Sequence, residues 1–364
     1  MSKLFSMFQL GKLALRNRII ISPMCQYSAR DGEANSWHLM HLGSLSHSGA
    51  SLMFIEATAV EPIGRITPHC LGLWDDKTQA ALARVINEVR KYSDIKIGLQ
   101  IAHAGRKAST RSMWEGSAQI TVADGGWQTV APSSLPFLDS EIPPEALDTT
   151  ALGRIRDAFA AAAKRAHEIG IDVIEVHAAH GYLLHEFLSP LSNLRTDEYG
   201  GDFAARVRFP LEVFEAMRAA VPPHKPVGIR ISATDWVEGG WDLHQSAEFV
   251  KILKLRGCAF VDVSSGSLSP LQQIPVGPNY QVPLAEHIKA ATGMPTIAVG
   301  LITEPKQAEE VLAEDKADLV ALARGILYDP RWPWHAAAAL GAQVDAPPQY
   351  WRAAPNEHKD LFRK

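Results

Sequence analysis

The sequence of 364 residues has few features of a secreted, membrane-spanning or nucleic-acid-binding protein. Its three cysteines are scattered and odd in number, which argues against a disulfide framework or a Cys-x-x-Cys metal site. No apolar stretch is long enough to span a membrane, and the N-terminus lacks the pattern of a signal peptide. With a net charge of −4 and no basic run, neither nucleic acid nor an acidic membrane is expected as a partner. These absences predict a cytoplasmic protein.

A second absence concerns the fold. No Gly-x-Gly-x-x-Gly follows an early strand, so a dinucleotide-binding Rossmann domain is not expected. What the chain has instead is a series of short apolar, often β-branched runs, each followed by a longer segment of helical pattern. The eight runs are 18–22, 52–56, 96–101, 173–176, 227–231, 260–263, 296–299 and 319–322. Strands that alternate with helices favour a parallel sheet, and eight repeats in one chain favour its closure.

One helical segment shows the pattern clearly. Within 150–170, Ile155, Phe159, Ala163 and Ala166 fall on one face, and Gly170 marks the stop. We therefore predict an α/β fold: a single (β/α)₈ TIM barrel over 1–364, with an N-terminal hairpin and elaborated βα loops. The Gly-, Pro- and Trp-rich segment 102–149 is expected to be one such loop rather than a linker. Residues 345–364 are expected to form a C-terminal tail.

The C-terminal ends of barrel strands carry the chemistry in such folds, and one of them ends in two histidines and a tyrosine. His177, His180 and Tyr182 allow three interpretations. With Glu175, the histidines resemble part of a metal site, but a His-x-x-His at a strand end is not the one-face helical pair of metalloproteases. In the second interpretation they are hydrogen-bonded core residues. In the third interpretation, two neutral imidazoles stabilise a developing enolate oxygen, and Tyr182 supplies a proton.

Other strand ends carry groups suited to a phosphate and a polar ring. Gly300 and Arg324 follow the last two strands, where barrels of this kind often bind phosphate. Arg230 and Gln100 end two further strands and together suit a heteroaromatic ring with carbonyls and ring nitrogens. A phosphate beside such a ring describes flavin mononucleotide. Cys25 then offers a thiol beside the ring, with a buried inert cysteine as the alternative.

Taken together, these segments resemble the Old Yellow Enzyme family of FMN-dependent ene-reductases, in particular its thermophilic-like branch, which includes xenobiotic reductases. The resemblance runs along essentially the whole chain. It is carried by Leu15-Arg-Asn-Arg-Ile19, Ser22-Pro-Met-Cys-Gln-Tyr27, Ile55-Glu-Ala-Thr-Ala59, Gly64-Arg-Ile-Thr67, Gln100-Ile-Ala-His-Ala-Gly-Arg-Lys107, Trp114-Glu-Gly116, His177-Ala-Ala-His-Gly-Tyr182, Ser189-Pro-Leu-Ser-Asn193, Arg195-Thr-Asp-Glu-Tyr-Gly-Gly201, Arg230-Ile-Ser232 and Ala323-Arg324. The combination of His-x-x-His-Gly-Tyr with Arg-Thr-Asp-x-Tyr-Gly-Gly is the most specific part.

The resemblance implies an FMN site, a substrate site and a reaction. The residues expected to bind FMN are Ser22, Pro23, Met24, Cys25, Ala57, Gln100, Arg230, Gly300, Ala323 and Arg324. The substrate site would comprise Tyr27, His177, His180, Tyr182 and, from a neighbouring subunit, Arg352. NADPH or NADH would supply hydride to flavin N5, from which it passes to an α,β-unsaturated carbonyl or nitro compound that Tyr182 protonates. Cys25 would tune the flavin, and no metal is expected.

Two departures from the family pattern concern the cofactor and substrate pockets. Ala323-Arg324 stands where relatives often have Gly-Arg, and Gly300-Leu-Ile-Thr303 lacks the Trp of some xenobiotic reductases. The tail segment Gln349-Tyr-Trp-Arg352 resembles the one that reaches a neighbouring active site, which implies a homodimer or homotetramer. The alternatives from other classes are a metal-dependent barrel hydrolase or aldolase using His177, His180 and Glu175, and a flavin-binding protein without turnover.

Overall fold

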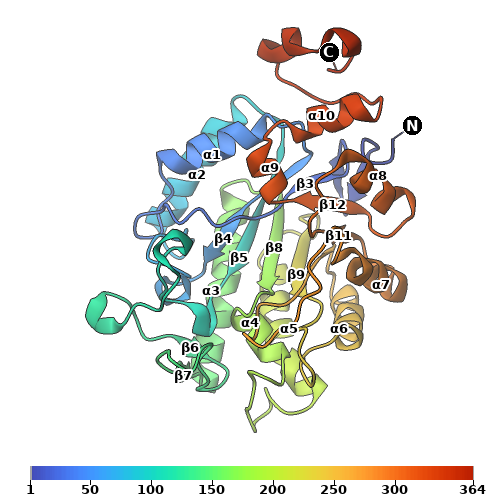
Figure 1. The fold of residues 1–364 in the computed structure, drawn as a ribbon. Helices are drawn as coiled ribbons and strands as arrows, with labels where there is room; N and C mark the ends of the chain where they lie inside the picture. Colours follow the sequence, from blue (N-terminus) through green and yellow to red (C-terminus); the bar gives the residue numbers. More distant parts are fainter. Residues whose placement is uncertain (1, 364) are drawn as a thin grey trace.

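A closed barrel of eight parallel strands forms the centre of the computed structural model, which describes residues 2–363 (Figure 1). Each of the eight runs predicted from sequence is one of its strands. The strands are β3 Ile19–Ile21, β4 Leu52–Ala59, β5 Lys96–Ala102, β8 Val173–Ala178, β9 Val227–Ser232, β10 Val261–Ser264, β11 Thr296–Ala298 and β12 Leu319–Leu322. Pairing of β12 with β3 closes the barrel, so the predicted (β/α)₈ architecture is confirmed.

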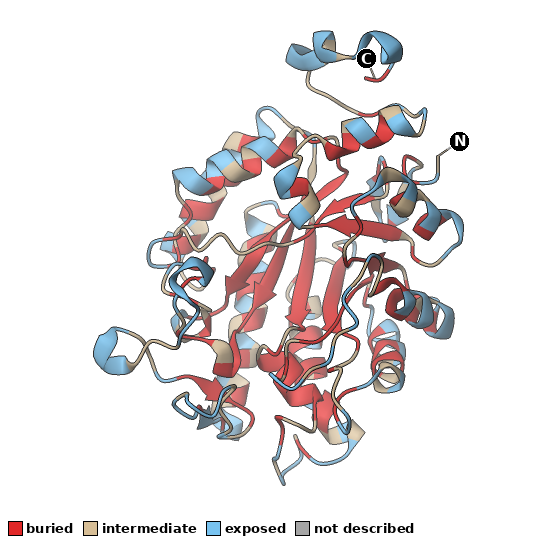
Figure 2. Ribbon diagram, viewed as in Figure 1, coloured by how far each residue is buried: buried red, intermediate tan, exposed pale blue. Residues whose placement is uncertain are grey.

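Helices surround the barrel, and all but α4, which is completely buried, bury one face and leave the other exposed (Figure 2). They are α1 Ser36–Ser46, α2 Asp76–Arg90, α3 Thr149–Glu168, α5 Phe203–Ala219, α6 Leu243–Leu255, α7 Val282–Thr292, α8 Pro305–Ala313, α9 Arg324–Tyr328 and α10 Trp332–Ala339, with a short α4, Leu183–Leu188, directly after β8. In α3 the four apolar residues named from the sequence are all buried, as predicted. No helix in the described part of the chain is long and apolar enough to cross a membrane.

The barrel interior changes from apolar to polar along the strand direction. Side chains on a strand alternate between the two faces, so every second residue points inward. Near the strand starts the inward positions hold Phe54 and Phe260, whose rings lie 6.2 Å apart. Gly98 and Gly228 make room for them, because a Cβ at either position would come within 2.5 Å of a phenyl ring. The inward positions that follow are polar, which places a polar chamber toward the carboxyl ends of the strands.

An N-terminal hairpin closes the apolar end of the barrel, as predicted. Its strands are β1, Phe8–Leu10, and β2, Leu13–Leu15. Leu10 and Leu15 are fully buried in the same apolar cluster as the barrel residues Ile20 of β3 and Leu52 of β4. The barrel is therefore sealed at its N-terminal end, and ligands have access only from the carboxyl ends of the strands.

The segment 102–149 is the elaborated loop that the sequence predicted. It contains the short helices η2 Gly105–Lys107, η3 Met113–Glu115 and η4 Val122–Asp124, and the two-residue strands β6 Val130–Ala131 and β7 Glu145–Ala146. Part of it projects from the barrel in Figure 1. Trp114 on this arm is 70% exposed, yet its ring meets Tyr27 edge-on at 5.7 Å. The arm thus extends the wall of the chamber outward.

Candidate active site

The inward residues of four neighbouring strands build the floor of the polar chamber. On β5 and β8, Gln100 and Glu175 are register partners, and the Gln100 amide donates a hydrogen bond of 2.8 Å to the Glu175 carboxyl. On β9 and β10, Arg230 and Asp262 are partners and form an ion pair of 3.3 Å. Asp262, which sequence analysis did not single out, is therefore the anionic neighbour of the buried Arg230.

Two buried carboxyl groups share one arginine in this floor. Burial, together with the nearby Asp262, raises the pKa of Glu175 well above its usual range. Burial also raises the pKa of Asp262, which the Arg230 charge opposes. Since Arg230 contacts Asp262, we assign the negative charge to Asp262 and the proton to Glu175. The floor then carries one ion pair and one neutral acid.

His177, His180 and Tyr182 gather above the floor. The ring centroids of His177 and His180 are 5.2 Å apart, and those of His177 and Tyr182 are 5.0 Å apart, both edge to face. Burial and the Arg230 charge lower the pKa of both histidines well below the usual range, so both imidazoles are neutral at pH 7. Burial raises the pKa of Tyr182 well above its usual range, so the phenol keeps its proton. Two neutral donors beside a protonated phenol can together bind an oxygen and transfer a proton.

The histidine rings differ in what holds them. His180 Nε2 lies 2.7 Å from the hydroxyl of Ser264, at the end of β10, and that contact orients its ring. His177 is almost completely buried, yet its Nδ1 has no hydrogen-bond partner among the described residues. A buried polar atom without a partner is costly, and such atoms commonly mark the place of a ligand.

Further unpartnered atoms surround the chamber and test whether FMN fits. The buried Ser22 hydroxyl has no partner in the described part of the chain, and Arg230 Nε lies near Asp262 without the alignment of a hydrogen bond. Gly300, after β11, has a φ of +122°, and a Cβ there would meet the amide of Gln281 at 2.9 Å. Unsatisfied hydroxyl and guanidinium donors, together with a glycine after β11 that carries no side chain, suit a flavin ring and phosphate. The residues present therefore fit FMN.

The other residues expected at the cofactor lie at the same ends of the strands. Ser22 follows β3, and its N–H donates to Leu322 of β12, which joins the two strands where the barrel closes. Met24 and Cys25 continue from there, and burial raises the pKa of the Cys25 thiol well above its usual range, so the thiol is neutral. Ala57 lies within β4, while Ala323 and the exposed Arg324 follow β12.

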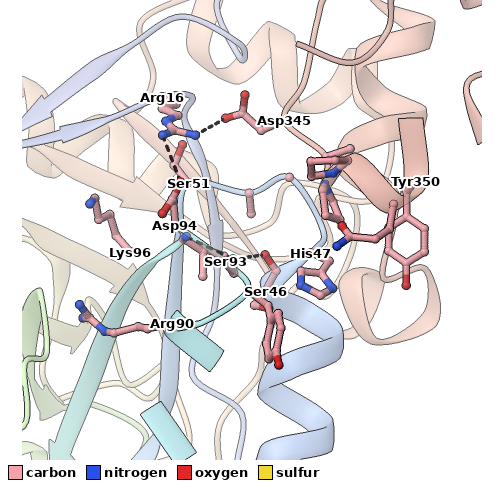
Figure 3. A pocket seen from close by; sticks show the side chains of 18 of the residues that line it. Arg16, Ser46, His47, Ser51, Arg90, Ser93, Asp94, Lys96, Asp345 and Tyr350 are labelled. Carbon is pink, nitrogen blue, oxygen red and sulfur yellow. Dashed lines mark hydrogen bonds and ion pairs between the residues drawn. The ribbon is translucent and has the colours of Figure 1, made fainter. Parts of the chain in front are cut away.

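Arg352 does not join the other substrate residues of its own chain. It lies in η5, Pro348–Ala353, and is exposed. The tail residues before it line a cavity of about 770 Å³ together with Ser51 and Lys96 at the starts of strands, and Asp345 of the tail pairs with Arg16 at 3.1 Å (Figure 3). The tail therefore lies at the N-terminal end of the barrel, opposite the chamber, and Figure 1 shows it beyond α10, away from α4.

The metal interpretation of His177, His180 and Glu175 lacks its ligand set. Within residues 2–363, no three His, Cys, Asp or Glu side chains are arranged to hold a metal ion. Glu175 faces Gln100, and His180 faces Ser264.

His185 lies in the short helix α4. It is fully buried, its Nε2 lies 2.8 Å from Asp235, and its Nδ1 accepts from the N–H of Gly181 at 2.9 Å. No sequence pattern linked His185 to an aspartate 50 residues away, and only the barrel brings them together.

Comparison with known proteins decides the family. The sequence model of the NADH:flavin oxidoreductase / NADH oxidase family matches residues 3–343. The chain belongs to this family. It is the Old Yellow Enzyme family that the sequence motifs indicated, and the predicted FMN cofactor agrees with it. This member of the family is therefore an oxidoreductase.

Two bacterial relatives match almost end to end. The NADPH dehydrogenase of Listeria innocua is 42% identical over 355 residues, which cover 97% of this chain and 99% of the relative. That of Geobacillus thermodenitrificans is 43% identical over 351 residues, which cover 96% and 98%.

Solved structures share the fold. Morphinone reductase in complex with tetrahydroNAD is 28% identical, with a TM-score of 0.77 over 100% of this chain and 98% of the other. A complex of 2-naphthoyl-CoA reductase has a TM-score of 0.83 at 21% identity. This chain spans about half of its length (52%), so that likeness shows the fold alone.

Proposed function

We propose that this family member reduces the C=C bond of α,β-unsaturated carbonyl compounds and nitroalkenes with NADPH or NADH as the hydride donor. The observation that carries the proposal is the packing of His177 against both His180 and Tyr182 at 5.0–5.2 Å. Because both imidazoles are neutral and the phenol is protonated, the three groups suit oxygen binding followed by proton transfer. The two NADPH dehydrogenases that match end to end support the choice of nicotinamide.

FMN, when bound, would relay hydride from the nicotinamide to the substrate. Its holders would be the ten residues inferred from sequence, with Arg230 and Gln100 on the floor and Gly300, Ala323 and Arg324 at the phosphate. Asp262 fixes the Arg230 guanidinium, and Glu175 fixes the Gln100 amide, so both stand in set orientations. Cys25 would contribute a neutral thiol next to the ring, because burial keeps it protonated.

The residues around the substrate divide the work. The unpartnered Nδ1 of His177 and the ring of His180, which Ser264 orients, would bind the carbonyl or nitro oxygen. As the β carbon gains hydride, negative charge develops on that oxygen, and hydrogen bonds to it strengthen. The O–H bond of Tyr182 then breaks as a C–H bond forms at the α carbon, and water reprotonates the phenolate. Tyr27 would line the outer side of the substrate with Trp114 behind it.

We also propose that the active form is a homodimer or homotetramer in which Arg352 enters a neighbouring site. The support is that the tail packs against its own chain while Arg352 is exposed. Trp334 of α10 packs on Phe362 with ring centroids 4.8 Å apart, and Val344 pairs with Phe362 as a β-bridge. Arg352 is exposed at the barrel end remote from its own chamber.

One preparation tests the proposed reaction against its alternatives. Purified protein should be yellow, release FMN on denaturation, lose its colour with NADPH under anaerobic conditions and regain it when an enone such as cyclohex-2-enone is added. A colourless protein that requires a metal for activity would favour the hydrolase or aldolase. A yellow protein that neither nicotinamide bleaches would show binding without turnover. Rates with enones, maleimides and nitroalkenes would then rank the substrates.

A further inference from the structure

Lys107 is a half-buried lysine beside the active site. The reaction proposed above assigns it no role. It is the last residue of η2, after β5. Its ammonium group donates to the backbone carbonyl oxygens of His180 and Ser267, both at 2.9 Å. These carbonyls belong to the loops after β8 and β10. One side chain therefore connects three loops at the mouth of the chamber.

The loops that Lys107 connects are strained and touch each other. His180 and Gly181 have φ values of +60° and +72°, and Ser267 has a φ of +70°. A Cβ at Gly181 would come within 2.3 Å of the Ser267 carbonyl oxygen, so the two loops are in direct contact. Left-handed conformations at residues other than glycine are unfavourable and persist only where the surroundings hold them. Since Tyr182 follows this turn directly, whatever holds the turn also places the phenol.

Two further hydrogen bonds reach the turn. The Ser232 hydroxyl accepts from the His180 N–H at 2.9 Å, and His185 accepts from the Gly181 N–H. Lys107 brings a positive charge to the turn, and its Nζ lies 5.3 Å from the centroid of the Tyr182 ring and 4.7 Å from that of Phe137. An ammonium at this distance favours an electron-rich ring and favours a phenolate still more.

We propose that Lys107 is a positioning residue that clamps the His180–Gly181 turn to the loop after β10 and stabilises the Tyr182 phenolate left by proton transfer. The inference rests on the proposed function of Tyr182. The step balances: the Tyr182 O–H breaks, the α C–H forms, and the phenol carries the negative charge, with its ring centroid 5.3 Å from the Lys107 ammonium, until water returns a proton. Lys107 transfers no proton itself.

The charges around Lys107 give this role a pH range. Burial lowers the pKa of Lys107 to about 8. The charge of Arg106 lowers it further, while Glu186 and Glu141 raise it. Its other neighbours, His177 and His180, are neutral near pH 7, and Tyr182 is protonated. The Lys107 charge is therefore present below pH 8 and is lost above it. Burial also raises the pKa of Glu186 to about 8, so the two groups must be separated by experiment.

The test uses the FMN-loaded enzyme and three variants, Lys107→Met, Lys107→Arg and Glu186→Gln. Stopped-flow rates of reoxidation by cyclohex-2-enone are measured from pH 6 to 10, together with amide hydrogen exchange of residues 178–183. The wild type should slow above pH 8, and Lys107→Arg should lose this break because arginine keeps its charge. Lys107→Met should be slower at pH 7 by about tenfold, the effect of one pKa unit on the phenol, with faster exchange in the turn. Glu186→Gln should keep a break, moved to lower pH because the raising effect of Glu186 on the Lys107 pKa is lost.

Several outcomes would overturn the proposal. They are wild-type rate and exchange in Lys107→Met, a break near pH 8 that survives in Lys107→Arg, or a break that disappears in Glu186→Gln. If Lys107→Met fails to fold, the profile of Lys107→Arg still decides. Tyr182→Phe separates this proposal from the proposed reaction. If Tyr182→Phe reduces enones at the wild-type rate, Tyr182 is not the proton donor. If Tyr182→Phe is slow but Lys107→Met has the wild-type rate, only the role of Lys107 is refuted.

Discussion

His177 and Tyr182 meet edge to face, with ring centroids 5.0 Å apart and planes at 82°. The contact joins the strand end of β8 to the residue that caps α4, across the left-handed turn at His180 and Gly181. An oxygen-binding group and a proton donor are thereby fixed relative to each other within six residues of chain. This geometry allows the two groups to act on neighbouring atoms of one substrate, the oxygen-bearing end and the α carbon.

Removing the His177 imidazole should weaken binding of ligands that resemble the enolate. Phenols carry an anionic oxygen on a flat ring, and a hydrogen bond to a charged group contributes about 1.5–3 kcal/mol. His177→Ala should therefore bind 4-hydroxybenzaldehyde roughly 10- to 100-fold more weakly, measured by titration of the flavin absorbance. His224→Ala, a change at an exposed histidine outside the site, is the control. Equal phenol affinity in His177→Ala and the wild type would refute the oxygen-binding role.

His103 should make the protein sensitive to acid. It is buried, its Nδ1 accepts from the Gly105 N–H, and its Nε2 faces Glu61 at 3.0 Å, so the ring has no room for a second proton on Nδ1. Burial lowers its pKa from 6.5 to about 3. Between these two pH values His103 is protonated in the unfolded chain but not in the folded one. The contribution of His103 to the free energy of unfolding is therefore fully present above pH 6.5 and decreases as the pH falls below it.

The contribution of His103 can be isolated by urea unfolding at two pH values. Because of His103, the free energy of unfolding should fall by about 2 kcal/mol between pH 7 and pH 5. His103→Asn keeps an acceptor for Gly105 but cannot titrate, so its loss over this interval should be smaller by that amount. The same loss in both proteins would show that His103 is not held neutral.

Arg352 can be tested by complementation between subunits. Tyr182→Phe and Arg352→Ala should each be poorly active alone. When the two are unfolded and refolded together, mixed oligomers contain a site with an intact Tyr182 and a neighbour's intact Arg352, and activity should return. Lys359→Ala, an exposed cation on the same tail, should behave as the wild type. No recovery in mixtures whose oligomers are shown by mass to be hybrid would exclude a contribution from the neighbour.

Features that depend on local sequence patterns could be predicted, whereas contacts between distant residues could not. The barrel followed from runs such as 227–231, because buried parallel strands are nearly continuous in apolar residues and each was followed by a helical period. The triad His177, His180 and Tyr182 was found because all three lie within one strand end. The pairing of Arg230 with Asp262 depends on strand register, which no local pattern states.

Loop contacts were the part that the sequence could not supply. Lys107 lies in a motif that sequence analysis quoted, but its partners are backbone carbonyls of two distant loops, and a carbonyl looks the same at every residue. The buried pair His185 and Asp235 was missed because the two residues approach only after β8 and β9 lie side by side. The cofactor and substrate roles of the site residues stay predictions.

The most direct test of the central claim compares the two half-reactions in Tyr182→Phe by anaerobic stopped-flow spectroscopy. Replacing a general acid typically costs a factor of about 10²–10⁴, and the phenol takes no part when the nicotinamide reduces the flavin. We predict that reduction of the flavin by NADPH keeps its wild-type rate, while reoxidation by cyclohex-2-enone slows by about 10²-fold or more. Equal slowing of both half-reactions, or unchanged reoxidation, would contradict the assignment of Tyr182 as the proton donor.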